Sequence, residues 1–317
     1  MSNESPIRYG FRTIWREPSL ALAEIAWRWS WGAATLLFAW FAGHEFLRSL
    51  TVSHRDEWQL QSGSPQLIAD AIMHIFQGSG PTVLRLFLIV APASVLLWVI
   101  AATLGRTVTL RSLVAGDARF TGRSLSLHLW RAVIGALSFG GTVLSFLAAA
   151  LLMARTEPPQ PLVFMAVFFP LTLLFTFVRS RINWLLLLGN IYAARGMKAG
   201  EGFGQATVVF RRRSGEFMGV GGVAGALRIV LIGVVTFLDL ALVPFAGEAS
   251  SWLLWALFAV ITLAYFAVSD WLYMVKLAAY ARIIEEDARP AEAPAAVAAA
   301  PRIPPAPVAP IPSVPAR

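Results

Sequence analysis

The chain of 317 residues contains no cysteine and few charged side chains. Without cysteine it forms no disulfide and no thiolate metal site, and its redox compartment is not fixed by composition. Charged residues make up 14% of the chain, whereas a soluble domain carries about 25%. Composition therefore argues against a soluble globular protein.

Motifs with a known chemical role are also missing from the sequence. There is no Walker A loop, no G-x-S-x-G and no H-E-x-x-H. The histidines His44, His54, His74 and His128 do not have the spacing of metal ligands. We therefore predict no catalytic residue, no metal and no cofactor, and an enzyme is less favoured than a non-catalytic protein.

Hydrophobic sequence is what the chain has in abundance. Hydrophobic residues make up 57% of it, and the mean hydropathy is +0.65. Several continuous apolar runs approach or exceed the roughly 20 residues that cross a bilayer as a helix. A membrane β-barrel would instead show segments of about 10 residues with alternating hydrophobicity. The sequence therefore predicts an all-α, polytopic membrane protein.

Six apolar runs define the predicted transmembrane domain, residues 19–286. Their approximate bounds are 27–47, 82–104, 130–153, 161–180, 219–245 and 252–275. A short cytoplasmic segment, 1–18, precedes the domain, and a Pro/Ala-rich tail, 287–317, follows it. Such a tail cannot bury a core, so we predict that it is disordered.

The first two runs are separated by a predicted loop over residues 51–80. Ser64-Pro65 begins a short amphipathic helix within this loop, with apolar residues at helical spacing up to Phe76. This helix either packs on the bundle or lies on the outer leaflet.

Arginine and lysine are unevenly distributed between the two sides of the predicted bundle. They are concentrated between the N-terminus and Arg28 and in the connections 105–131, 179–213 and 276–289. Because cytoplasmic loops carry an excess of these residues, we predict both termini to be cytoplasmic. The six spans then form three hairpins. Only Lys198 and Lys276 are lysines, an arginine bias that is consistent with a GC-rich bacterial genome, and we predict a bacterial inner-membrane protein.

Two connections share a sequence pattern. Leu104–Asp117 and Leu188–Glu201 both contain Leu-Gly, then Arg, then Ala-Gly and an acid at equal offsets. The pattern favours hairpins that repeat one another in the same direction, although these residue types are common at the inner ends of membrane helices.

A family resemblance rests on the region around the fourth and fifth spans. Its residues are Arg179 or Arg181, Gly200, Ala206, Phe210, Arg211, Gly215 and Phe217. In this region the chain resembles the integral membrane domain of bacterial membrane-bound glycerophosphodiester phosphodiesterases and of related stand-alone membrane proteins of unassigned function. The sequence has no soluble region long enough for a phosphodiesterase domain. The resemblance therefore implies the membrane fold only and transfers no catalytic residue.

A candidate polar site lies in the outer half of the predicted bundle. Asp239 falls inside the fifth span, and His44 and Glu45 fall near the outer end of the first. An acid within a span is costly and often functional, so this group is a candidate site for a proton or cation. The alternative is a polar group paired within the bundle or reached by water.

Candidate contacts for lipid head groups lie toward the inner side. Arg211, Arg212 and Arg213 form a basic run before the fifth span, and Arg228 lies within that span. The run alternatively serves only as an orientation signal, and Arg228 alternatively snorkels or pairs with an acid. Asp270 is predicted to pair with Arg179 or Arg181.

The function that these patterns favour is that of a non-catalytic scaffold or accessory domain. It would engage membrane lipids or partner membrane proteins, and the charge of +8 is attributed to cytoplasmic loops rather than to nucleic acid. A transporter that uses Asp239 is the alternative, and a membrane enzyme comes third.

Overall fold

The structure is a computed structural model and describes residues 4–114, 120–158, 160–247 and 251–288. Within these ranges every regular element is a helix. The elements are α1 (Pro6–Arg16), α2 (Pro18–Ser49), α3 (His54–Gln61), α4 (Pro65–Phe76), α5 (Gly80–Val114), α6 (Phe120–Ala154), α7 (Pro161–Ala194), α8 (Ala199–Arg212), α9 (Ser214–Leu242), η1 (Val243–Gly247) and α10 (Ser251–Ala288).

Five of these helices (α5, α6, α7, α9 and α10) are long and apolar enough to cross a membrane. At about 1.5 Å per residue, a helix of 35 residues such as α5 is about 50 Å long. The hydrocarbon core is only about 30 Å thick, so these helices extend beyond it. Length and composition thus confirm the prediction of an all-α, multi-pass membrane protein.

The most apolar parts of these helices face outward. None of the most apolar stretch of α7 or of α9 is buried within the protein. Large side chains such as Phe237 of α9 and Leu173 of α7 are 71% and 66% exposed. A soluble protein rarely exposes so much contiguous apolar surface, whereas lipid tails solvate it without cost.

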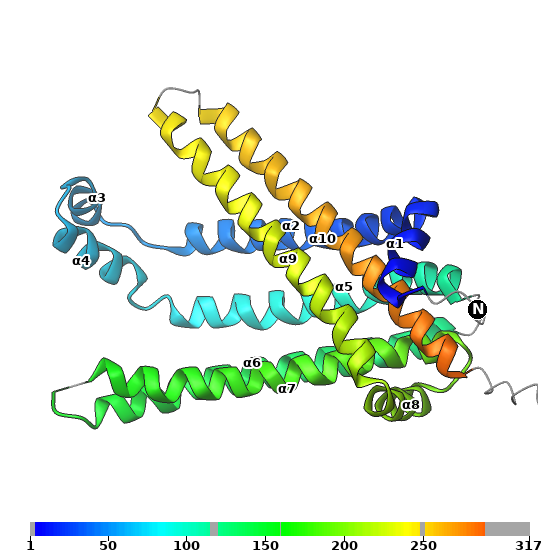
Figure 1. The fold of residues 1–317 in the computed structure, drawn as a ribbon. Helices are drawn as coiled ribbons and strands as arrows, with labels where there is room; N and C mark the ends of the chain where they lie inside the picture. The colour runs from blue at the N-terminus through cyan, green and yellow to red at the C-terminus, as the bar shows by residue number, and fades with distance from the viewer. Residues whose placement is uncertain (1–3, 115–119, 159, 248–250, 289–317) are drawn as a thin grey trace, which may run out of the picture.

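The long helices pack in sequential pairs. α2 packs against α5, α6 against α7, and α9 against α10, while α5 also contacts α6. Figure 1 shows α2, α5, α6 and α7 side by side as a layer, with the α9–α10 pair crossing that layer at a steep angle and diverging from it at one end.

The hydrophobic core lies at the opposite end of the bundle, where α1 and α8 are located (Figure 1), and we call this the core end. Its fully buried side chains come from most of the long helices and include Ile14, Leu110, Ile191, Phe217 and Met274. α1 packs along α10, and Gly10 permits this contact, because a Cβ there would lie 2.4 Å from the carbonyl oxygen of Val275. The core end is therefore the part of the molecule held by protein packing.

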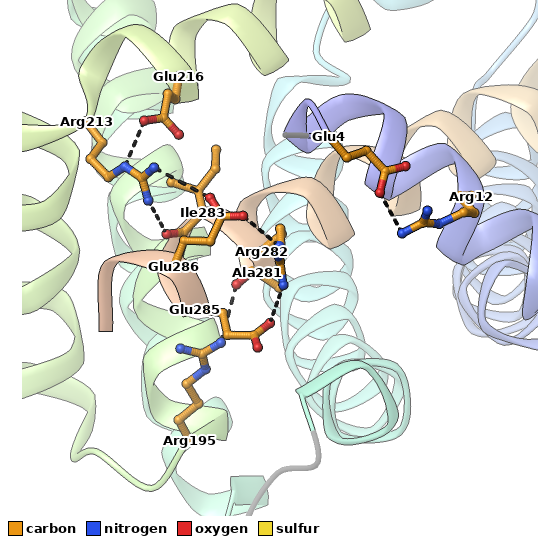
Figure 2. Close-up of polar contacts among 10 residues, drawn as sticks. All are labelled: Glu4, Arg12, Arg195, Arg213, Glu216, Ala281, Arg282, Ile283, Glu285 and Glu286. Atoms are coloured by element: carbon orange, nitrogen blue, oxygen red, sulfur yellow. Dashed lines mark hydrogen bonds and ion pairs between the residues drawn. The ribbon is translucent and has the colours of Figure 1, made fainter. Parts of the chain in front are cut away.

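Ion pairs between α8, α9 and α10 reinforce the core end (Figure 2). The guanidinium of Arg213 contacts Glu216 at 2.8 Å and Glu286 at 3.6 Å, and it donates to the carbonyl oxygen of Ile283 at 2.9 Å. Arg282 pairs with Glu286 at 2.7 Å within α10. These contacts hold the α8–α9 connection against the last turns of α10.

The structure extends two sequence predictions and leaves a third outside its range. The fourth predicted span, 161–180, belongs to a helix that continues to Ala194, and residues 186–194 of this helix are buried in the core. The predicted loop 51–80 contains α3 in addition to the expected helix α4. The predicted disordered tail lies outside the described residues from position 289 onward.

Candidate functional site

A buried glutamate in α2 organises a polar network next to the core end. Glu24 is 0% exposed, and its Oε1 accepts from Arg28 Nε at 2.7 Å one turn along the same helix. The same oxygen contacts Nη2 of Arg106 in α5 at 2.9 Å, and Arg106 is only 3% exposed. Trp27 Nε1 donates to the other carboxylate oxygen at 2.9 Å. Buried charges are tolerated when they are paired in this way.

Arg28 carries this network from α2 to α10. Its Nη1 lies 2.6 Å from Oδ1 of Asp270, which is 8% exposed. The predicted partners of Asp270, Arg179 and Arg181, are instead exposed on α7. That prediction is wrong because α10 packs directly against α2, which brings Arg28 to Asp270.

Tyr273 provides an aromatic partner to both arginines. The guanidinium carbons of Arg28 and Arg106 lie 4.3 Å and 4.6 Å from the centre of its ring, within the range of cation–π attraction. Gly105 allows Trp27 to approach α5, since a Cβ at this position would lie 2.2 Å from the Trp27 ring. The arginine side chains are thus fixed by both carboxylates and rings.

A cavity of about 900 Å³ opens beside this network, and we call it the large cavity. α2, α5, α6, α9 and α10 all contribute to its wall. Its basic lining residues are Arg28, Arg106, Arg131 and Arg228. Its apolar and aromatic wall includes Trp29, Trp31, Leu36, Trp98, Leu263 and Phe266.

The large cavity carries a surplus of positive charge. Four guanidinium groups line it, and the carboxylates of Glu24 and Asp270 neutralise two of them. Arg131 and Arg228 form no ion pair with any carboxylate of the described residues. The guanidinium carbon of Arg131 instead lies 5.8 Å from the ring centre of Trp98. An anion entering the cavity therefore meets two arginines that are not already paired.

Several polar atoms of the large cavity's lining residues have no hydrogen-bond partner among the described residues. They include Nη1 of Arg106, Nε1 of Trp31 and Nε2 of His128. His128 is 0% exposed, and its Nδ1 donates to the carbonyl oxygen of Ser124 at 2.8 Å. Unpaired buried polar atoms, here the donors of Arg106 and Trp31 and the acceptor Nε2 of His128, are uncommon and call for a ligand or water as partner.

A second cavity, of about 580 Å³, lies on the other side of Arg131 and Tyr273, which line both cavities. We call it the small cavity. α7 takes the place of α2 and α5 in its wall, while α6, α9 and α10 line both cavities, and its further basic residues are Arg181 and Lys276. Trp184 and Tyr280 contribute aromatic surface to it.

The three residues of the predicted outer polar site are not joined in the structure. Asp239 is half-buried in α9, and its Oδ1 is buried without a partner among the described residues. His44 and Glu45 are exposed on α2, and no hydrogen bond or ion pair in the described ranges links either of them to Asp239. A role for Asp239 stays a prediction.

The predicted lipid contacts divide between two environments. Arg212 pairs with Asp287, and Arg213 pairs with Glu216 and Glu286, so protein carboxylates already occupy both. Arg211 is exposed at the end of α8. Of the predicted contacts, Arg228 is the one that lines the large cavity.

Sequence reasoning missed the residues that build this site. Arg28, Arg106 and Arg131 were interpreted only as orientation signals, and Glu24 was not singled out. The sequence feature that could have revealed Glu24 is its position one turn before Arg28 in a tryptophan-rich segment, since such spacing places both side chains on one helix face.

Within the described ranges, no group of three or more His, Asp or Glu residues could hold a metal ion.

No family model, curated protein or solved structure matches the chain. The resemblance to the phosphodiesterase membrane domain therefore stays an expectation from the sequence, and the functional argument rests on the geometry of the two cavities.

Proposed function

We propose that this protein binds the phosphate head group of an anionic lipid in the large cavity and acts as a non-catalytic scaffold or accessory protein. The observation that carries the proposal is the pair of unneutralised arginines, Arg131 and Arg228, in a cavity walled mainly by apolar and aromatic side chains. An anionic amphiphile matches both the positive charge and the apolar wall of this cavity.

The chemistry of the lining favours phosphate as the anion. A guanidinium presents several N–H donors in a planar fork that matches phosphate oxygens. Nη1 of Arg106 and Nε1 of Trp31 are further donors without partners among the described residues. The hydrophobic wall formed by Leu36, Leu263 and Phe266 would accept an acyl chain.

In the proposed topology, the large cavity lies at the level of the lipid head groups of the inner leaflet. We propose six spans in three hairpins in a bacterial inner membrane, with α2 as the first span and both termini cytoplasmic. Positive charge concentrates at the cytoplasmic side of such proteins, which supports assigning the core end to that side. Glu24, Arg106 and Asp270 lie about one turn from core residues Ala21, Leu110 and Met274 along their helices, which corresponds to the inner head-group region.

The lipid content of the purified full-length protein tests the proposal. The R131Q/R228Q double variant should retain at least about tenfold less anionic lipid than the wild type, because the loss of even one charge-assisted hydrogen bond, roughly 1.5–3 kcal/mol, lowers affinity by about that factor or more. R155Q is the matched control, since Arg155 is exposed in the α6–α7 connection. Equal lipid content in the wild type and the double variant would count against the proposal.

A transporter remains a second candidate because of one observation. Oδ1 of Asp239 is buried without a partner among the described residues, within α9, and an unpaired intramembrane carboxyl is a candidate proton or cation site. In proteoliposomes, wild-type protein would move protons or cations and D239N would not. Absence of flux with the wild type would reject this candidate.

A further inference from the structure

We infer that the large and small cavities together form one site for a lipid with two phosphate groups, one held on each side of Arg131. This inference rests on the proposed lipid-binding function and specifies the ligand further. It concerns a single occupant, because the two cavities share part of their walls.

The shared wall consists of Arg131 from α6 and Tyr273 from α10. Elsewhere the cavities have different walls, with α2 and α5 contributing to the large one and α7 to the small one. Figure 1 shows α10 crossing the layer that contains α6. The two cavities therefore share the side chains of Arg131 and Tyr273, and the guanidinium of Arg131 is available to both.

Each cavity also has basic residues of its own. Arg228 lines only the large cavity, and Arg181 and Lys276 line only the small one. The small cavity adds the polar side chains of Ser180 and Asn183. Because phosphate is recognised by several donors at once, one phosphate in each cavity satisfies both groups of donors.

The cations of the small cavity are held by aromatic rings rather than by carboxylates. Lys276 Nζ lies 5.2 Å from the ring centre of Tyr273, and the guanidinium carbon of Arg181 lies 5.0 Å from that of Phe177. Neither cation forms an ion pair with an acid of the described residues. Their positive charge therefore remains available, as does that of Arg131 and Arg228 in the large cavity.

This distribution of charge separates a two-phosphate lipid from a one-phosphate lipid. A single phosphate can pair with Arg131 and with the basic side chains of one cavity only. The basic side chains of the other cavity then remain unpaired. A lipid with two phosphates pairs with both sets and pays the entropic cost of association once. It should consequently bind more tightly than a lipid with one phosphate.

Lipid titration of the full-length protein, followed by native mass spectrometry, tests the inference. The probes are cardiolipin, which has two phosphates, and phosphatidylglycerol, which has one. We expect one cardiolipin per chain and an affinity about tenfold higher than for phosphatidylglycerol, the factor that corresponds to one additional charge-assisted contact. The R181Q/K276Q variant should lose most of this preference and keep its affinity for phosphatidylglycerol within about twofold.

The R181K/K276R variant, which keeps both charges, should restore the preference, and an unchanged melting temperature verifies folding. Equal affinities of the wild-type protein for the two lipids overturn the inference but leave the proposed function intact. An equal loss of both affinities in R181Q/K276Q also overturns it. Failure of the wild type to bind either lipid rejects the proposed function as well. Inorganic pyrophosphate binding as tightly as cardiolipin overturns the lipid assignment, because the ligand would then be a soluble diphosphate.

Discussion

At the scale of single residues, Glu24 is the side chain on which the basic site depends. It is fully buried and bonds Arg28, Arg106 and Trp27 together. Removing one partner of a buried ion pair leaves the other charge without compensation, and this is more costly than losing an exposed pair. Glu24 therefore holds the arginines of α2 and α5 in place although it does not line the large cavity itself.

We predict that Glu24→Gln destabilises the protein by about 3–5 kcal/mol, because Arg106 then lacks its carboxylate partner while only 3% exposed. Glu45→Gln on the same helix should change stability by less than about 0.5 kcal/mol, since Glu45 is exposed. Denaturation of both variants in the same detergent provides the comparison. Equal unfolding midpoints of the two variants would show that the ion pairs of Glu24 do not stabilise the protein.

Gly105 gives a second prediction at this scale. A Cβ at this position lies 2.2 Å from the ring of Trp27, so Gly105→Ala must displace Trp27 from Glu24, at a cost of about 1–3 kcal/mol. Gly140→Ala on α6 is the control, because its Cβ meets nothing within 4 Å; it should be neutral or stabilising by up to about 1 kcal/mol. Detergent unfolding midpoints measure both. A similar shift for the two variants would contradict the close Trp27–Gly105 contact.

At the scale of elements, helix α3 shows how a short capped segment is stabilised. Ser53 and Asp56 form a reciprocal capping box, with Asp56 N donating to Ser53 Oγ at 3.3 Å and Ser53 N donating to Asp56 Oδ2 at 2.9 Å. His74 of α4 lies 2.9 Å from the other oxygen. One carboxylate thus caps α3 and connects it to α4.

These contacts predict a pH dependence for α3. Hydrogen bonds from the Ser53 side chain and backbone, and the contact with His74, lower the pKa of Asp56 below its ordinary value of 3.8. A lowered carboxyl pKa stabilises the folded state above the unfolded pKa, so the contribution is complete above about pH 4 and is lost as the pH falls through the lower, folded-state pKa.

Hydrogen-exchange protection factors of the α3 amides measure this effect. In the wild type they should stay constant above about pH 4 and fall as the pH drops below it. In Asp56→Asn they should be low throughout. Asp70→Asn on α4 is the matched control, because Asp70 is exposed, and it should behave as the wild type does. Wild-type protection that does not change on acidification would exclude the carboxylate as the source of the cap's stability.

The elements also show what the sequence could and could not predict. Continuous apolar runs are sufficient to locate α5, α6, α7, α9 and α10, because a membrane span requires such runs. The apolar sequence of α7 also continues to Ala194, but the pattern does not show whether its last turns lie in lipid or, as in the structure, are buried by protein. Helix α3 was missed, although the Ser53–Asp56 spacing is a recognisable cap.

The site was less predictable than the fold, because its contacts join residues far apart in the chain. Arg28 and Asp270 are 242 positions apart, and nothing in either local sequence specifies the pairing. Arginines near helix ends also serve as orientation signals. Counting them by position cannot distinguish Arg131, which lines both cavities, from Arg111, which is exposed.

At the scale of the whole molecule, the account requires that the core end and its arginines face the cytoplasm. We predict that reporters fused after Ser62, Glu157 or Gly247 report a non-cytoplasmic location. These positions follow α3, α6 and η1, at the ends of the helices opposite the core end. A reporter at the N-terminus should give a cytoplasmic signal and serves as the control. A cytoplasmic signal from any of the three internal fusions would refute six spans in this orientation.

Site-specific photolabelling shows whether an anionic lipid head group occupies the large cavity. A phosphatidylglycerol with a photoreactive group near its head group should label peptides of α2 around residues 29–36 and of α10 around residues 263–273, which line that cavity. The R131Q/R228Q variant should lose this labelling, whereas R155Q should retain it. Labelling concentrated at Arg211, or spread evenly over the outer surface of the helices in wild type and variants alike, would contradict the account.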